Sequence, residues 1–156
     1  MMRFLREHEK DFDAKDFDNG KQYYASNFVY VKTNGQSFSG DVAVKQLVED
    51  YALFKEHFHE PIYVVITETE DGYCLLGHAK LYVNLPVPGE KKYEDLQGRK
   101  WECLALGAYK FNVVKDDTGV QGLRFTSFQT FADPTPILSE AIKRKVIPVE
   151  ALTGGA

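Results

Sequence analysis

The spacing of apolar residues changes along the chain, and each spacing predicts a different element. In the first fourteen residues apolar side chains recur at helical spacing, which predicts an amphipathic helix ending near Ala14. Turn-prone residues follow, and Asp16 or Asp18 can cap a second short helix that runs toward Tyr24. From Asp41 a third, longer helix is predicted by a stripe of apolar residues: Val44, Leu47, Val48, Tyr51, Phe54 and Phe58.

Strand patterns fill most of the remaining chain. Residues 27–32 have the composition of a strand, and Asn34-Gly35 predicts a tight hairpin turn that ends near Ser39-Gly40. After Pro61 the chain predicts an antiparallel meander of long strands joined by turns at Asp71-Gly72 and at residues 116–119. Its strands are expected at residues 62–69, 73–87, 100–115 and 120–132. Residues 86–98 form a long connection that could lie across a pocket mouth, and residues 137–146 predict a terminal helix.

Alternation within these strands indicates which faces are buried. In residues 73–87 one alternate set is apolar and includes the small residues Gly77 and Ala79, which leaves room for a packed helix or a cavity. In residues 100–115 both alternate sets are apolar, so something must cover both. We expect Leu106, Ala108 and Lys110 to face the same space as Ala79. The other set is expected to be covered by a second copy of the protein: Trp101, Tyr109, Phe111 and Val113.

Composition narrows the class of protein. Helices followed by a long antiparallel sheet indicate an α+β fold, and 156 residues suit a single domain, 1–156, with residues 147–156 as a flexible tail. The net charge of −4, with both signs interspersed, argues against a nucleic-acid or anionic-membrane surface. Only two cysteines occur, and neither a signal peptide nor a membrane span is evident, so we expect a cytoplasmic protein with free thiols. Aromatic residues make up 13% of the chain, enough for both a core and a pocket wall.

The order of elements and several short motifs resemble the nuclear-transport-factor-2-like superfamily, which includes ketosteroid isomerase, scytalone dehydratase and the SnoaL-like polyketide cyclases. The resemblance implies a curved antiparallel sheet wrapped around three helices, a cystatin-like α+β barrel with a conical apolar pocket. It also implies frequent dimerisation through the outer face of the sheet. The motifs that carry it are Phe12-Asp13-Ala14-Lys15-Asp16-Phe17-Asp18, Tyr23-Tyr24-Ala25, Phe28-Val29-Tyr30-Val31, and Gly35 with Ser39-Gly40 before Val42-Ala43-Val44.

The same resemblance suggests positions for a site. Asp13 falls where scytalone dehydratase has a pocket aspartate, and Phe12 falls where that family has a catalytic tyrosine, so the hydroxyl is missing here. Lys32 falls roughly where ketosteroid isomerase has its general-base aspartate, and an ammonium cannot be that base. Either His57 or His59 could match the histidine of the dehydratase pattern.

From these positions and the strand pattern we expect four polar side chains to converge on the cavity. Asp13 would act as a base or orient a histidine, His59 would act as a base, and Lys110 would act as an electrophile or acid. Arg124 would face the same cavity from the next strand. Each residue also has a plainer interpretation, respectively a helix cap, a surface histidine, a solvated lysine and a salt-bridged sheet arginine. Expected substrate-binding residues are Phe12, Tyr24, Tyr30, Lys32, Ala79, Val83, Leu106, Thr126 and Phe128.

No phosphate loop, nucleophile elbow, metal constellation or dinucleotide fingerprint occurs in the sequence, so we expect no cofactor and no metal. The favoured function is a cofactor-independent isomerase, dehydratase or cyclase that acts on a hydrophobic oxygenated small molecule, in secondary-metabolite biosynthesis. Two alternatives stay open: a non-catalytic carrier with the same pocket, and a protein-interaction module of the same fold. The expected partners are a hydrophobic small molecule and a second copy of the chain, with no nucleic acid and no membrane.

Overall fold

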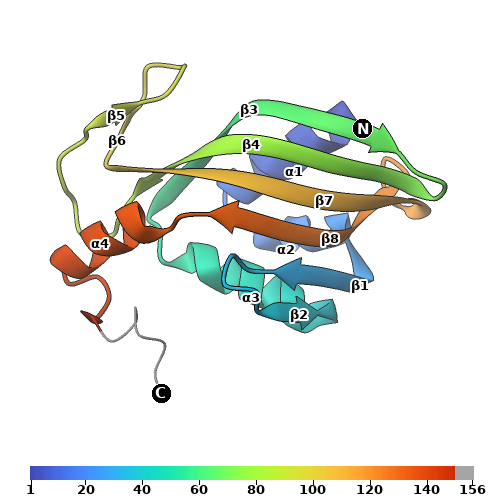
Figure 1. The fold of residues 1–156 in the computed structure, drawn as a ribbon, viewed down its shortest axis with the longest axis horizontal. Helices are drawn as coiled ribbons and strands as arrows, with labels where there is room; N and C mark the ends of the chain where they lie inside the picture. The colour runs from blue at the N-terminus through green and yellow to red at the C-terminus, as the bar shows by residue number, and fades with distance from the viewer. Residues whose placement is uncertain (150–156) are drawn as a thin grey trace.

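The computed structural model describes residues 1–149 and contains four α-helices within that part of the chain. The tail expected at residues 147–156 lies outside the described residues from residue 150 onward. Three helices lie behind the sheet in the view of Figure 1: α1 (Met2–Asp13), α2 (Phe17–Gly20) and α3 (Gly40–Ala52). The fourth, α4 (Thr135–Lys143), continues from the end of the last strand, and a short 3₁₀ turn, η1 (Lys21–Tyr23), joins α2 to the first strand.

A curved six-stranded sheet forms the other layer (Figure 1). Its strand order is β2-β1-β8-β7-β4-β3, and every neighbouring pair is antiparallel except β1 and β8, which run parallel. A separate two-stranded sheet pairs β5 (Tyr93–Glu94) with β6 (Lys100–Trp101). The strands of the large sheet are β1 (Tyr24–Val31), β2 (Ser37–Ser39), β3 (Glu56–Glu68), β4 (Gly72–Asn84), β7 (Cys103–Val120) and β8 (Leu123–Ala132).

Local sequence signals placed the short elements correctly. The Asp16 carboxylate accepts a hydrogen bond from the Asn19 backbone N–H at 3.2 Å and so caps α2. The Asn34-Gly35 turn joins β1 to β2, and Gly35 takes a φ of 85°, a conformation that glycine adopts without steric cost.

The boundary between α3 and β3 differs from the expectation. The helix ends at Ala52, and β3 begins at Glu56, so Phe58 lies in a strand and not at the end of the helical stripe. Pro61 therefore lies inside β3, which is an edge strand of the sheet, and the pairing with β4 shifts by one residue between Pro61 and Tyr63. Similarly, β7 runs through the expected turn at residues 116–119, and the chain reverses at Gln121-Gly122, where both residues have positive φ.

The register of β4 against β7 corrects the choice of faces. Gly77 pairs with Tyr109 and Leu75 with Phe111, and directly opposed residues share a face of the sheet. The β4 set that contains Ala79 is the inner one, as expected. On β7, however, Tyr109 and Phe111 are on the inner face and Lys110 is on the outer face. Gly77 leaves no empty space, because the Tyr109 ring occupies the position that a Cβ at residue 77 would take.

The residues expected at a subunit interface are therefore internal. Val113 belongs to the main core, together with Phe4, Phe28 and Phe125. Trp101 is also buried, and its indole N–H donates to Asp95 at 2.9 Å. Both alternate sets of β7 are apolar because the inner set packs against the helices and the outer set forms an exposed sheet face.

A bulge in β8 accounts for a second wrong expectation. Ser127 pairs with Asn112 and Phe125 pairs with Val113, so Thr126 is an extra residue on β8. A bulge shifts the alternation by one residue. Phe125 and Phe128 consequently both face inward, while Arg124 does not share a face with Phe128.

Candidate active site

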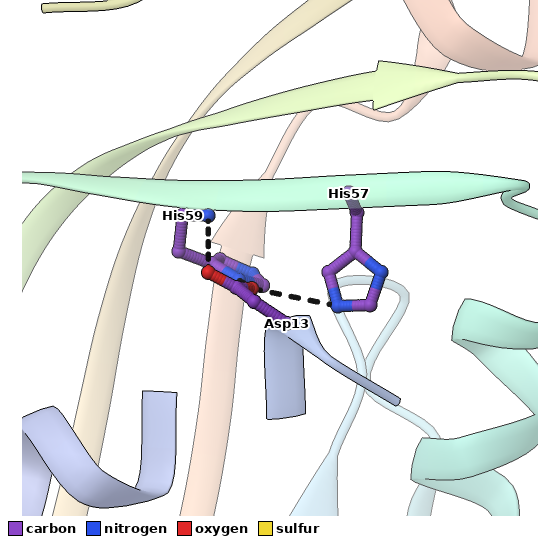
Figure 2. Close-up of side chains that lie close together, drawn as sticks. All are labelled: Asp13, His57 and His59. Atoms are coloured by element: carbon purple, nitrogen blue, oxygen red, sulfur yellow. Dashed lines mark hydrogen bonds and ion pairs between the residues drawn. The ribbon is translucent and has the colours of Figure 1, made fainter. Parts of the chain in front are cut away.

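The residues that come together most closely are Asp13 and His59. Asp13 is the last residue of α1, and His59 lies in β3, which packs across the end of that helix (Figure 2). Asp13 Oδ1 lies 2.7 Å from His59 Nδ1, and Asp13 Oδ2 accepts the His59 backbone N–H at 3.1 Å. These two contacts fix both the position and the rotation of the imidazole ring.

The second ring nitrogen of His59 meets Tyr51. A carboxylate only accepts hydrogen bonds, so Nδ1 of the neutral ring carries the proton and Nε2 has the free lone pair. The Tyr51 hydroxyl lies 3.1 Å from Nε2, where it can donate. Burial raises the pKa of Tyr51 above its ordinary value, so this hydroxyl stays protonated. The chain Asp13–His59–Tyr51 is therefore a polar relay that runs from the end of α1 to α3.

His57 lies beside this relay on the same face of β3 (Figure 2). Its Nε2 is 3.5 Å from Asp13 Oδ1, its side chain is fully buried, and neither ring nitrogen has a hydrogen-bond partner among the described residues. Burial lowers the pKa of His57 to about 4. His57 is thus neutral near pH 7.

Asp13, His57 and His59 offer ligand atoms that all lie within 4.8 Å of one another. Two imidazoles and a carboxylate are a donor set that zinc and other divalent transition metals accept. The spacing of the two histidines in the sequence could have predicted this cluster. His57 and His59 are separated by one residue in a strand, so both point to the same face, although they were expected to be alternatives.

His59 borders an internal cavity of about 70 Å³ enclosed by α1, α3 and the sheet. Most of its wall is apolar. Its lining residues are Leu5, His8, Glu9, Phe12, Leu47, Tyr51, His59, Ala79, Tyr109, Phe111 and Phe128.

This cavity is the narrow end of a longer depression. A second cavity of about 70 Å³ shares Tyr51, His59 and Ala79 with the first. That second cavity in turn shares Leu81 and Ala105 with an open groove of about 660 Å³. The groove lies between α3, α4 and the sheet. The hollow therefore widens from His59 toward the surface. This is the conical shape that the family resemblance implied for the pocket.

Two further titratable side chains line the inner cavity. His8 lies 2.8 Å from the Tyr24 hydroxyl through Nε2, and burial lowers its pKa to about 3. Glu9 faces the cavity from α1, and burial raises its pKa to about 7. Sequence reasoning did not select Glu9. The available signal was its spacing, since Glu9 and Asp13 are four residues apart on one helix.

Lys110 and Arg124, which were expected to join Asp13 and His59, lie elsewhere. Lys110 is on the outer face of β7, for the register reason given above. Arg124 pairs with Asp116 at 3.0 Å and donates to the backbone carbonyl of Tyr24 at 3.1 Å. Its guanidinium thus ties the β7–β8 hairpin to the start of β1. Neither cation is among the residues that line the inner cavity.

The expected substrate-binding residues separate into groups. Phe12, Ala79 and Phe128 line the inner cavity, and Tyr30 and Lys32 line the outer groove. The others do not line the inner cavity. Tyr24 borders a small void behind Phe12, Val83 is in the core, and Thr126 borders a surface depression beside Arg124. Leu106 is on the exposed outer face of β7 but lines the second cavity.

The connection at residues 86–98 does not cover the hollow. None of its residues lines the inner cavity or the outer groove. The Glu102 carboxylate holds it in place by accepting the backbone N–H groups of Leu85 and Gly89, each at 3.1 Å. Among residues 1–149, no helix combines the length and the apolar character needed to cross a membrane.

No protein-family model matches the chain, and no curated protein matches it. Solved structures do. A candidate scytalone dehydratase from Novosphingobium aromaticivorans superposes with a TM-score of 0.63 at 14% identity, covering 85% of this chain and 80% of its own. A candidate SnoaL-like polyketide cyclase from Shewanella denitrificans gives a TM-score of 0.63 at 11% identity, covering 91% and 96%. The hexachlorocyclohexane dehydrochlorinase LinA-type3 from Novosphingobium barchaimii gives 0.61 at 11% identity, covering 83% and 82%.

The chain has the nuclear-transport-factor-2-like fold. The alignments cover at least four fifths of each chain, and in this chain three helices and the curved sheet enclose the hollow. Within this nuclear-transport-factor-2-like fold, the relay of Asp13, His59 and Tyr51 lies at the narrow end of the cone.

Proposed function

We propose that this protein is a cofactor-independent enzyme that acts on a hydrophobic oxygenated small molecule by general acid/base catalysis, as an isomerase, dehydratase or cyclase. The observation that carries the proposal is the Asp13–His59 pair at the wall of an apolar cavity, with a contact of 2.7 Å. The resemblance to folds that include a candidate dehydratase, a candidate polyketide cyclase and a dehydrochlorinase supports it. A setting in secondary-metabolite biosynthesis, in the cytoplasm, is part of the same proposal.

The chemistry follows from the orientation of the imidazole. Asp13 holds the proton on Nδ1, so Nε2 is the basic atom. As a substrate enters, Tyr51 turns its hydroxyl from Nε2 toward a substrate oxygen, and Nε2 takes a proton from carbon or oxygen. The Asp13 carboxylate then stabilises the imidazolium that forms. The apolar wall excludes water and strengthens these interactions.

A base-catalysed elimination on a small aromatic probe tests this role. The probe is 5-nitrobenzisoxazole, whose ring opens when a base removes one C–H proton. We expect Asp13→Asn and His59→Gln to lower the rate by about 100-fold or more, because each removes the base or its orientation. His78→Gln is the matched control, since His78 lies on the outer face of β4 and packs on Tyr63. Equal rates in all three variants and the unaltered protein would remove the proposed base. Binding of the probe without turnover in the unaltered protein would favour a carrier.

We also propose that the protein is a homodimer formed through the outer face of the sheet. Leu76 and Leu106 are 52% and 53% exposed, although both are apolar residues of central strands. Their neighbours on the same face, Tyr63, Val65 and Phe131, are more than half exposed as well. A contiguous apolar patch of this kind is typical of an interface. The proposed interface is on the outer face of the sheet, as in the expectation from the sequence, but with a different set of residues.

A further inference from the structure

Among the described residues, Glu9 is the only carboxyl that lines the inner cavity, and the proposed base does not use it. Leu5, Glu9 and Asp13 follow one another at intervals of four residues, so they form one stripe along α1. That stripe faces the sheet. Asp13 reaches β3 and pairs with His59, while Glu9, one turn earlier, borders the inner cavity together with Tyr109. The base and a second carboxyl therefore open on the same small space.

The environment of Glu9 differs sharply from that of Asp13. Among the described residues, no side chain or backbone group makes a hydrogen bond or ion pair with the Glu9 carboxyl. Burial is therefore the main influence on the pKa of this carboxyl. Burial raises the pKa of Glu9 to about 7. With a pKa of about 7, this carboxyl is about half protonated at neutral pH, so it can donate a proton. A protonated carboxyl and an imidazole nitrogen with a free lone pair, both on the wall of one cavity, are suited to act as an acid and a base.

We infer that Glu9 is the general acid of this site, and that the reaction is an elimination in which it protonates the departing oxygen. This inference rests on the proposed function. The substrate class is a hydroxylated small molecule with an acidic C–H on the carbon next to the one that bears the hydroxyl. His59 Nε2 removes the C–H proton, the electron pair of that bond forms C=C, and the C–O bond breaks. The oxygen takes the Glu9 proton and leaves as water.

The cycle closes without an added reagent. After the elimination His59 holds one extra proton and Glu9 lacks one, so the proton returns from the imidazolium to the carboxylate through the released water. The products are an alkene and water, and the protein ends in its starting state. Tyr109 borders the same cavity, and burial raises its pKa to about 12, so it is a much weaker acid than Glu9.

Two probes that differ in leaving group separate this inference from the proposed function. In both benzisoxazole and 5-nitrobenzisoxazole a base removes the same C–H proton, but the phenolate that leaves the unsubstituted probe is more basic and gains more from an acid. We expect Glu9→Gln to lower the rate on benzisoxazole by about 10-fold or more and to change the rate on the nitro probe far less. Glu7→Gln is the matched control, because Glu7 lies on the same helix and pairs with Arg3 at 2.9 Å.

The outcomes are distinct. If Glu9→Gln slows both probes equally or slows neither, while His59→Gln abolishes both rates, the base stands and the acid is overturned. If His59→Gln keeps both rates, the proposed function fails. In that case a ¹³C NMR titration of the side-chain carboxyls, with Glu9→Gln to assign the resonance, still tests Glu9. A midpoint near 7 supports the protonated carboxyl, and a midpoint in the ordinary range for glutamate overturns it. Circular dichroism checks that each variant is folded.

Discussion

Glu9 and Asp13 lie one turn apart on the same face of α1, yet only Asp13 has a partner, the imidazole of His59 at 2.7 Å. This difference follows from position along the helix. Asp13 is at the helix end, where the strand β3 crosses, whereas Glu9 lies further back, opposite the cavity wall formed by β7. One helix thus supplies a carboxyl that orients His59 at the cavity wall and a second carboxyl that lines the cavity itself.

The Glu9 carboxyl should reduce stability at alkaline pH. Its pKa is raised to about 7 in the folded protein, so the unfolded chain ionises first as pH rises from about 4.5, and the folded state loses stability up to about pH 7. We expect Glu9→Gln to increase the free energy of unfolding at pH 8 by about 1–2 kcal/mol, after allowance for partial solvent screening. At pH 4 the two proteins should be closely similar. Urea unfolding at both pH values measures this, and a gain of equal size at pH 4 would contradict it.

His57 should make the protein sensitive to acid. Because its pKa is lowered to about 4 in the folded state, the unfolded chain binds a proton first as pH falls below about 6.5. Stability is therefore present above pH 6.5 and is lost progressively down to about pH 4. We expect His57→Gln to remove about 2 kcal/mol or more of this decline, as seen in urea unfolding between pH 7 and pH 4. His8, whose pKa is lowered to about 3, contributes a similar loss that remains in the variant. An unchanged pH dependence would show that folding does not lower the pKa of His57.

Filling the narrow end of the cone should block the site without unfolding the protein. Ala79 lines the inner cavity from β4, so Ala79→Leu places added carbon atoms in a space of about 70 Å³. We expect the rate on the nitro probe to fall by about 10-fold or more while the free energy of unfolding changes by less than about 1.5 kcal/mol. Ala52→Leu is the control, because Ala52 is an exposed residue at the end of α3 that lines none of the three connected cavities. A variant that retains the full rate would place the reaction outside this cavity.

Most of the fold was predictable from the chain because local signals determined the elements. The Asn34-Gly35 turn, the Asp16 cap and the alternation in β4 each act over a few residues. The faces of β7 and β8 were not predictable in the same way. Both sides of β7 are apolar, so alternation cannot choose between them, and an extra residue at Thr126 reverses the parity of β8.

The residues of the candidate site were likewise predictable only in part. The resemblance placed Asp13 and allowed His57 or His59, and the structure brings Asp13 together with both. Lys110 and Arg124 were selected from strand parity, which the register and the bulge changed. Glu9 and Tyr51 were not selected because helical and buried-core interpretations already accounted for them. Their role depends on which elements enclose the cavity, and that is a long-range property of the fold.

The exposed face of the sheet predicts the oligomeric state. We expect a dimer at micromolar concentration by light scattering, and Leu106→Glu should convert it to a monomer, because it places a charge in the centre of the apolar patch. Lys110→Glu is a useful comparison, because Lys110 lies on the same face and already carries a charge. This change reverses a charge but does not place one at an apolar position. A monomer in the unaltered protein would contradict the proposed interface.

Chelation tests whether the cluster of Asp13, His57 and His59 works as a base or as a metal site. In the proposed mechanism Asp13 orients His59 directly, so dialysis against EDTA should leave the rate on the nitro probe within about 2-fold of its starting value. Added Zn²⁺ should inhibit the reaction, because a cation bound by these side chains would occupy lone pairs that the mechanism needs. His59 needs its lone pair to accept a proton, and Asp13 needs its own to hold His59 in place. His57→Gln should weaken that inhibition while keeping the base. Loss of activity on chelation, with recovery on adding Zn²⁺, would instead assign the cluster to a catalytic metal.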